Sequence, residues 1–369
     1  MNRVPLTRPT LGAEELAEIS TVLDSGMLVQ SRAVAELEIA LSQAVNISPL
    51  IACSSGTSAI HLAVAALDLG PGDEVIVPDF CFPSVASAVI FSGATPVLCD
   101  VDPDSFNMDI ERVSAAFSPK TRAILAVHQF GIPVGATAIQ AAFDVPVIED
   151  AACALGGHDD GGPCGGQTDL GCFSLHPRKI ITTAEGGMVF ARDPELAERI
   201  RALRNHGMAR GDDGWEFVGV GFPYRMSEVH AAIGLGQLPR LEGILAGRRR
   251  AALAYRDRLA EIDSVVTCDA LWQSGRVYQG MVVRLKPHID RNAMIAHLRS
   301  DGIEATIGTY AIHRQSQLAR HARISAGGLE GSVLAAEGSI TLPLFPEMTD
   351  SDVDRVVTRL KAGVGTAHD

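Results

Sequence analysis

The fold of this chain is decided by the stretch Phe173-Ser174-Leu175-His176-Pro177-Arg178-Lys179, which is followed by Glu185-Gly186-Gly187-Met188. An apolar, strand-like run, Val147-Ile148-Glu149-Asp150, precedes it and ends in a carboxylate. A lysine amine can form a Schiff base with an aldehyde cofactor. A carboxylate at the end of a strand can keep a pyridine nitrogen protonated. Lys179 and Asp150 together therefore predict an enzyme that uses pyridoxal 5'-phosphate (PLP).

Length and charge limit the classes of protein to which the chain can belong. Its 369 residues exceed the size at which a single hydrophobic core stops growing, so two domains are expected. The formal net charge of -13 argues against nucleic acid or an anionic membrane as a partner. The N-terminus has no signal-like apolar segment, and no apolar run approaches the ~18 residues of a membrane span. We expect a cytoplasmic protein that acts on small molecules.

The seven cysteines, an odd number, form no Cys-x-x-Cys pair and show no zinc-like spacing. Several lie in apolar, strand-like runs. We therefore expect buried, reduced thiols and no metal site.

Short apolar runs alternate with helix-like segments between about residues 50 and 190. This alternation predicts right-handed crossovers and a mainly parallel sheet with helices on both faces. Ligands bind such sheets at the carboxyl ends of the strands. Strands are expected at 74–77, 96–99, 123–127 and 145–148, and helices at 58–69, 84–91, 109–117 and 136–143.

The pattern changes in the second half of the chain. We expect a large domain over residues 1–240 and a smaller α+β domain over 241–369, joined by a long helix at about 240–260. The run Arg248-Arg249-Arg250 in that helix is interpreted as a solvated face. Residues 208–220, with Trp215, are either a specificity element or an ordinary surface loop.

A phosphate site is predicted where Gly56, Thr57 and Ser58 open a helix. Free N–H groups and the helix dipole attract an anion there, Gly56 allows close approach, and the hydroxyl groups add donors. The alternative is that this serine-rich stretch only caps the helix.

The remaining cofactor contacts come from side chains that follow strands. Phe82 could cover a face of the cofactor ring, or pack in the core. Asp150 would pair with the ring nitrogen, or cap a helix. Ser174 offers a hydroxyl to the phosphate, and His176 lies beside it in sequence. Lys179, once released as a free amine, would move the proton at the substrate carbon.

These residues lie in motifs that resemble the DegT/DnrJ/EryC1/StrS family of PLP-dependent sugar aminotransferases, and the likeness covers nearly the whole chain. The matching motifs are Leu23-Asp24-Ser25-Gly26, Ser54-Ser55-Gly56-Thr57-Ser58, Pro71-Gly72-Asp73-Glu74, Val101-Asp102-Pro103-Asp104, His128-Gln129-Phe130-Gly131, Ile148-Glu149-Asp150-Ala151-Ala152, 173–188, Arg204-Asn205-His206-Gly207, Tyr224-Arg225-Met226-Ser227-Glu228 and Leu342-Pro343-Leu344.

The resemblance implies a fold-type I α/β enzyme. Its large domain would hold a mainly parallel, seven-stranded-type sheet, and its C-terminal domain would be smaller and α+β. It also implies a homodimer with active sites shared between subunits. Tyr224 and Arg225 would reach the partner subunit's cofactor, and His313, preceded by Tyr310, would face the substrate.

Four positions depart from the family pattern. Cys153 replaces a usual glutamine and is a poor hydrogen-bond partner for the cofactor's 3-hydroxyl. Pro223 replaces an asparagine and cannot donate a hydrogen bond to the phosphate across the interface. Ile180 and Phe345 are the other two departures. Some family members carry histidine in place of the lysine and dehydrate their substrate, so Lys179 indicates an aminotransferase.

The expected reaction moves an amino group from an amino acid, L-glutamate or L-glutamine, to a keto-sugar, possibly nucleotide-linked, or to a keto-cyclitol. Pyridoxamine 5'-phosphate (PMP) would hold the nitrogen between the two half-reactions, in natural-product or cell-surface sugar biosynthesis. The alternatives are a PLP-dependent dehydratase or lyase, a non-catalytic PLP-binding regulatory protein, and an α/β enzyme without PLP.

Overall fold

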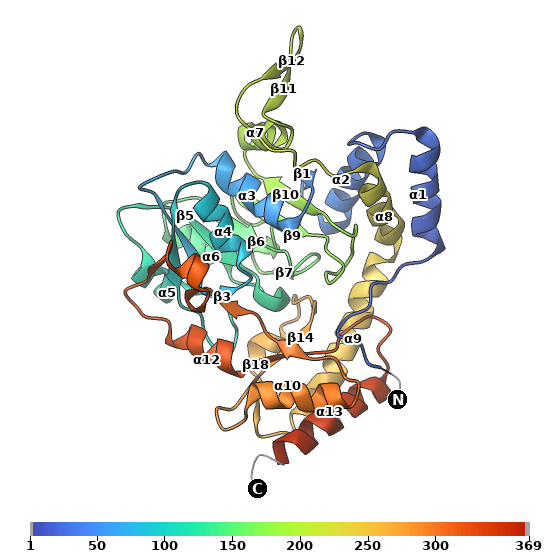
Figure 1. Cartoon of the computed structure of the whole chain (residues 1–369), viewed down its shortest axis with the longest axis vertical. Helices are drawn as coiled ribbons and strands as arrows, with labels where there is room; N and C mark the ends of the chain where they lie inside the picture. The colour runs from blue at the N-terminus through green and yellow to red at the C-terminus, as the bar shows by residue number, and fades with distance from the viewer. Residues whose placement is uncertain (1–2, 366–369) are drawn as a thin grey trace.

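A computed structural model describes residues 3–365, and an eight-stranded sheet forms its centre (Figure 1). All strands run parallel except β10, which is antiparallel to both of its neighbours. The order across the sheet is β1 (Leu50–Cys53), β10 (Gly187–Ala191), β9 (Leu170–Ser174), β6 (Val147–Asp150), β5 (Thr121–Val127), β2 (Glu74–Pro78), β4 (Thr95–Cys99) and β17 (Arg323–Ile324). The mainly parallel sheet is confirmed, and the short β17 adds an eighth strand.

Helices cover both faces of this sheet because alternate strand residues point to opposite sides. Val75 and Val77 pack in the same core as residues of α3 (Gly56–Ala66), α4 (Ser84–Phe91) and α7 (Pro194–Arg204). Ile76, between those two valines, packs in a second core with α5 (Ile110–Ala116) and α6 (Ala136–Ala142). At the β1 end, α2 (Arg32–Val45) and α8 (Glu228–Gln237) pack against β1, β9 and β10, and α1 (Ala13–Ser25) lies against α8.

The long helix α9 (Leu241–Leu259) leads to a second, antiparallel sheet with its own core. The order of this sheet is β13 (Val265–Val266), β14 (Met281–Leu285), β18 (Ser339–Leu342) and β15 (Thr306–Ile307), and α10 (Arg291–Ser300) and α13 (Asp350–Gly365) pack on it. The remaining elements are α11 (Ser316–Ala319), α12 (Glu330–Gly338) and the strand pairs β7 (His158–Asp159) with β8 (Gly162–Pro163) and β3 (Phe80–Cys81) with β16 (Tyr310–Ala311).

The two parts of the chain are interwoven. β17 pairs with β4 in the large sheet, and β16 pairs with β3. Residues 310–324 therefore return to the N-terminal part, and a boundary at residue 240 stays a prediction.

The solvated-face interpretation is wrong for Arg248. Its side chain is buried and donates hydrogen bonds to the backbone carbonyls of Gln279 and Leu344, at 2.9 and 3.3 Å. Burial lowers the pKa of Arg248 to about 10. Helical periodicity places Arg248 on the buried stripe with Ile244 and Tyr255, whereas the next two arginines are exposed.

The segment at 208–220 contains a β-hairpin. β11 (Met208–Gly211) pairs with β12 (Gly214–Phe217), and the pair projects from the body of the molecule (Figure 1). Trp215 and Phe217 on this hairpin are 64% and 75% exposed, and Val220 behind it is 92% exposed. The segment therefore holds regular secondary structure, and its role as a specificity element stays a prediction.

Candidate active site

Three predicted site segments meet at the carboxyl edge of the large sheet. β1, β6 and β9 run in the same direction, so Cys53, Asp150 and Ser174 end their strands at one edge. Gly187, the first residue of β10, lies between Cys53 and Ser174 in the strand register. A Cβ atom on Gly187 would lie 2.3 Å from the carbonyl oxygen of Ser55, so only glycine allows this close approach.

The predicted phosphate segment forms the start of α3. Ser55 caps the helix, and its hydroxyl accepts a hydrogen bond from the Ser58 N–H at 3.0 Å. The Ser58 hydroxyl in turn accepts a hydrogen bond from the Ser55 N–H at 2.8 Å. The side chains of Ser55 and Ser58 therefore cap the helix, as the alternative to a phosphate site expected. Thr57 is exposed, and a Cβ on Gly56 would lie 2.6 Å from the Cβ of Ser174. The helix N-terminus and the Ser174 side chain thus adjoin, as a shared anion site requires.

Asp150 is a buried carboxylate with little local compensation. Within residues 3–365, its side chain makes one hydrogen bond, from the Ala152 N–H to Oδ1 at 3.0 Å. Burial raises the pKa of Asp150, while the Ala152 N–H and the charge of Lys179 oppose that rise. No helix begins after Asp150, so the helix-cap alternative is wrong. A protonated pyridine nitrogen is a fitting partner for the second carboxylate oxygen.

Lys179 lies on the loop between β9 and β10, and its Nζ atom donates to Cys153 Sγ at 3.2 Å. Backbone hydrogen bonds from Leu175 N to Gly186 O, and from Thr183 N to Leu175 O, at 2.8 and 2.9 Å, tie the loop at its base. The sheet edge therefore brings Lys179, Cys153 and Asp150 together, although they come from different segments.

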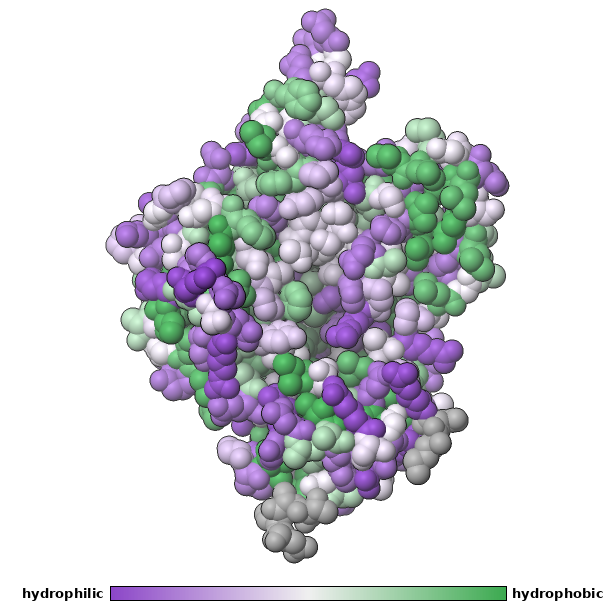
Figure 2. Space-filling view, in the orientation of Figure 1, coloured by the Kyte–Doolittle hydropathy of each residue, from purple (hydrophilic) through white to green (hydrophobic). Residues whose placement is uncertain are grey.

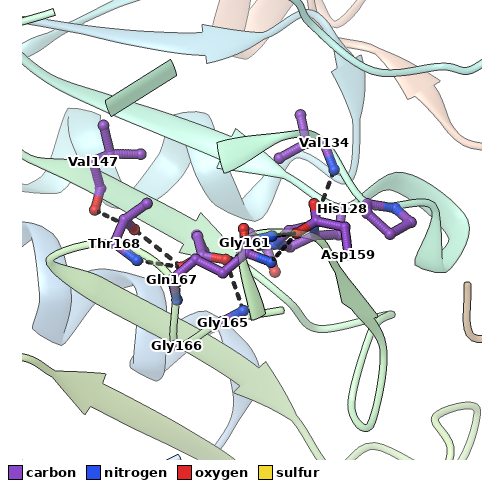
Figure 3. Close-up of polar contacts among 12 residues, drawn as sticks. His128, Val134, Val147, Asp159, Gly161, Gly165, Gly166, Gln167 and Thr168 are labelled. Atoms are coloured by element: carbon purple, nitrogen blue, oxygen red, sulfur yellow. Dashed lines mark hydrogen bonds and ion pairs between the residues drawn. The ribbon is translucent and has the colours of Figure 1, made fainter. Parts of the chain in front are cut away.

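Beneath this edge lies a buried cluster that the sequence analysis did not predict (Figure 3). Glu149 is fully buried and accepts hydrogen bonds at 2.8 Å from the backbone N–H groups of Gly165, Gln167 and Thr168. His128 Nε2 lies 2.9 Å from the same carboxylate, and its Nδ1 accepts from a backbone N–H, which assigns the proton to Nε2. Burial would raise the pKa of Glu149, but these hydrogen bonds hold it below its ordinary value. The cluster anchors the end of β6 and so fixes the position of the next residue, Asp150.

The aromatic residue predicted to cover the cofactor ring is accessible. Phe82 is 61% exposed, which excludes the core-packing alternative, whereas Phe80 is buried. The ring of Phe82 lies edge-on to the ring of Tyr310, and their centroids are 6.3 Å apart. His313 Nδ1 lies 2.6 Å from an Asp79 carboxylate oxygen, a pairing that the sequence analysis missed.

Three further predicted residues make local contacts. The Tyr224 hydroxyl lies 3.1 Å from His61 Nδ1, and the Arg225 guanidinium donates to Asn205 Oδ1 at 2.7 Å. His176 Nδ1 accepts from the Arg178 N–H at 3.3 Å, and burial lowers the pKa of His176. Their roles toward a cofactor or a partner subunit stay predictions.

The residues at the edge fit PLP. A glycine-lined helix N-terminus beside Ser174 suits a phosphate, the buried Asp150 suits a ring nitrogen, and the amine of Lys179 suits an aldehyde.

Within residues 3–365, no three His, Cys, Asp or Glu side chains are placed to hold a metal ion. None of the helices described for the chain is long and apolar enough to span a membrane.

Known proteins resemble the chain in sequence and structure. A model of the DegT/DnrJ/EryC1/StrS aminotransferase family matches residues 9–361. The aminotransferase TlmJ from Streptoalloteichus hindustanus is 33% identical, with 99% of this chain and 100% of TlmJ covered and a TM-score of 0.92. Spr1654 from Streptococcus pneumoniae, solved in its PMP form, is 25% identical, with 100% of this chain and 99% of Spr1654 covered and a TM-score of 0.91. The E coli GDP-4-keto-6-deoxy-D-mannose-3-dehydratase with bound hydrated PLP shares the fold at 23% identity, with 98% and 100% covered and a TM-score of 0.91.

Proposed function

The chain belongs to the DegT/DnrJ/EryC1/StrS family of aminotransferases, whose cofactor is PLP, and from this membership we infer the reaction that it catalyses. It transfers the amino group of L-glutamate or L-glutamine to the keto group of a sugar or cyclitol. The observation that carries this inference is the primary amine of Lys179 at the same sheet edge as the buried Asp150 carboxylate.

Bound PLP supplies an aldehyde that accepts an amino group and a ring that delocalises the negative charge developing at the substrate carbon. Lys179 binds the cofactor and, as a free amine, carries the proton from one carbon to the other. Asp150 keeps the ring nitrogen protonated, and the N-terminus of α3 with Ser174 holds the phosphate. The loop that carries Lys179 is tied at its base, which restricts where the amine can reach.

A basic cavity supports a phosphate-bearing keto-sugar, such as a nucleotide-linked one, as the substrate. The cavity has a volume of about 550 Å³ and includes Arg178, the residue before Lys179. Arg3 and Arg299 also line the cavity, and Glu304 is the one acidic residue in its lining. Arg3 forms an ion pair with Glu304. Within residues 3–365, the side chain of Arg178 makes no hydrogen bond or ion pair; its contacts are made by the backbone. This local excess of positive charge, in a chain of net charge -13, suits a diphosphate group.

Two exposed apolar surfaces support a homodimer. Apolar side chains gather over α1 and the segment that follows it (Figure 2): Leu16, Leu23, Met27, Leu28 and Val29 are 49–69% exposed. The projecting hairpin carries Trp215 and Phe217. A second copy of the chain would cover such surfaces, and sedimentation equilibrium tests this expectation.

The reaction is tested by loading the enzyme with PLP and L-glutamate and adding keto-sugars, both nucleotide-linked and free. Release of 2-oxoglutarate together with an aminated sugar supports the proposal. Consumption of the keto-sugar with no 2-oxoglutarate would instead indicate a dehydratase, and no reaction with any donor would indicate a regulatory PLP-binding protein.

A further inference from the structure

Asp79 and His313 form a tightly connected pair, although 234 positions separate them in the sequence. One Asp79 oxygen accepts from the His313 backbone N–H at 2.8 Å, and the other lies 2.6 Å from His313 Nδ1. The Ile312 N–H also donates to the Asp79 carbonyl at 2.8 Å. The Asp79 side chain is fully buried, while that of His313 is 20% exposed. Both the backbone and the ring of His313 are therefore held by one carboxylate.

This contact determines which ring nitrogen carries the proton. An ionised carboxylate is only an acceptor, so Nδ1 carries the hydrogen, and in the neutral ring Nε2 keeps a lone pair. Within the described part of the chain, His313 makes its hydrogen bonds through the backbone N–H and Nδ1, and none through Nε2. The exposed side of the ring can thus accept a hydrogen bond from a ligand.

The pair lies at the same sheet edge as Asp150. Asp79 directly follows β2, and His313 follows β16, which pairs with β3. Cys81 of β3 is close enough to both acidic residues that, in addition to burial, their charges raise its pKa. Tyr310 of β16 contacts Phe82, the residue predicted to cover the cofactor ring. His313 is therefore placed beside the site assigned to cofactor and substrate.

We propose that Asp79 is a positioning residue that locks His313 in its Nδ1–H form, so that Nε2 accepts a hydrogen bond from a hydroxyl group of the keto substrate. The proposal rests on the sugar or cyclitol aminotransferase function and assigns this acceptor to the keto half-reaction. L-Glutamate has no hydroxyl group, so the first half-reaction does not need Nε2 as an acceptor.

The variant Asp79→Asn tests the proposal because an amide is nearly the same size but can donate to Nδ1. The proton of His313 would then move to Nε2, which becomes a donor and opposes the substrate hydroxyl. We expect ¹⁵N NMR of labelled histidines to show the change from Nδ1–H to Nε2–H. In kinetics, kcat/KM for the keto substrate should fall by roughly 10- to 100-fold, the cost of leaving the substrate hydroxyl without its acceptor. The rate with L-glutamate should change by less than about twofold, since that half-reaction does not use Nε2.

Two further variants keep the test decisive. Asp68→Asn, a matched change at an exposed aspartate with a positive φ, should leave the NMR spectrum and both half-reactions unchanged. His313→Gln should lower kcat/KM for the keto substrate, and adding Asp79→Asn to it should cost nothing more, because Asp79 acts through the imidazole.

An unchanged His313 tautomer in Asp79→Asn, an equal loss in both half-reactions, or additive losses in the double variant would overturn the proposal. If Asp79→Asn does not fold, the effect of His313→Gln on the two half-reactions decides. A wild-type protein that aminates no sugar or cyclitol would contradict the proposed function instead, while the NMR experiment would still report the tautomer.

Discussion

Lys179 Nζ lies 3.2 Å from Cys153 Sγ, so the amine is held by a sulfur atom rather than by a carboxylate. A thiol is a weak acceptor, and the contact is therefore easily broken. An amine that must leave its resting place to bind PLP and move a proton gains from such a weak contact. In the proposed mechanism, the buried carboxylate of Asp150 is left to pair with the ring nitrogen.

The matched variants Lys179→Ala and Cys153→Ala separate the two partners of this contact. Lys179→Ala should lower turnover by at least ~10³-fold and remove the visible absorption band of lysine-bound PLP, since alanine has no amine. Cys153→Ala should keep the band and change turnover by less than about tenfold, because only a weak hydrogen bond is lost. Absorption spectra and steady-state rates measure both. A Lys179→Ala enzyme that keeps either its band or its rate contradicts the assigned role.

Asp150→Asn should have opposite effects on stability and on rate. The raised pKa of buried Asp150 means that, between its unfolded and folded pKa values, the folded protein holds a proton that the unfolded chain has released. Stability of the cofactor-free protein therefore falls as pH rises through this window. The amide of the variant has no charge to bury, so thermal unfolding should show the variant more stable than wild type at neutral pH, with the gain vanishing in acid.

The turnover of Asp150→Asn should fall by roughly 10²- to 10⁴-fold because the ring nitrogen loses its partner. A wild-type rate in the variant would show that the ring nitrogen has another partner.

The sequence predicted the parts of the site that follow from strand order. β6 was expected at 145–148 and ends instead at Asp150, but the alternation of apolar runs correctly placed this carboxylate at the carboxyl edge of the sheet. The small residues Gly56 and Gly187 were part of quoted motifs, and the structure shows that each lies against another backbone or side chain.

The missed features depend on contacts between distant segments. Glu149 looked like part of an apolar strand, and only the structure reveals its five hydrogen-bond donors, four from the loop at 165–168 and one from His128. The partner of Asp79 is 234 positions away, a distance that no local pattern spans. The hairpin was missed although Asp213-Gly214 is an Asp-Gly pair of the kind that often indicates one; in the structure this pair is offset by one position, and Asp212 and Asp213 form the turn.

Gly187→Ala should damage the phosphate cradle. The added methyl group would lie 2.3 Å from the Ser55 carbonyl oxygen, so either β10 or the start of α3 must move. We expect a loss of roughly 1–3 kcal/mol in the free energy of unfolding and weaker PLP binding. Gly243→Ala is the matched control, because Gly243 lies in helix α9 and an added Cβ would meet nothing within 4 Å. That variant should be more stable by about 0.5–1 kcal/mol and bind PLP normally. Chemical denaturation measures the free energy of unfolding, and PLP titration measures cofactor binding. Equal values for the two variants would refute the close approach of Gly187 to the Ser55 carbonyl.

Arg178→Ala should distinguish a phosphate-bearing substrate from a free sugar. Arg178 lines the basic cavity and directly precedes Lys179 in sequence, so its loss should raise KM for a nucleotide-linked keto-sugar by about tenfold, the scale of one charge-assisted hydrogen bond. The half-reaction with L-glutamate should be unchanged, and Arg249→Ala, an exposed arginine of α9, should alter neither. Added salt should weaken wild-type binding more than that of the variant, because part of the attraction is screened. If Arg178→Ala binds nucleotide-linked and free keto-sugars as wild type does, the cavity does not hold the phosphate groups and the nucleotide-linked assignment fails.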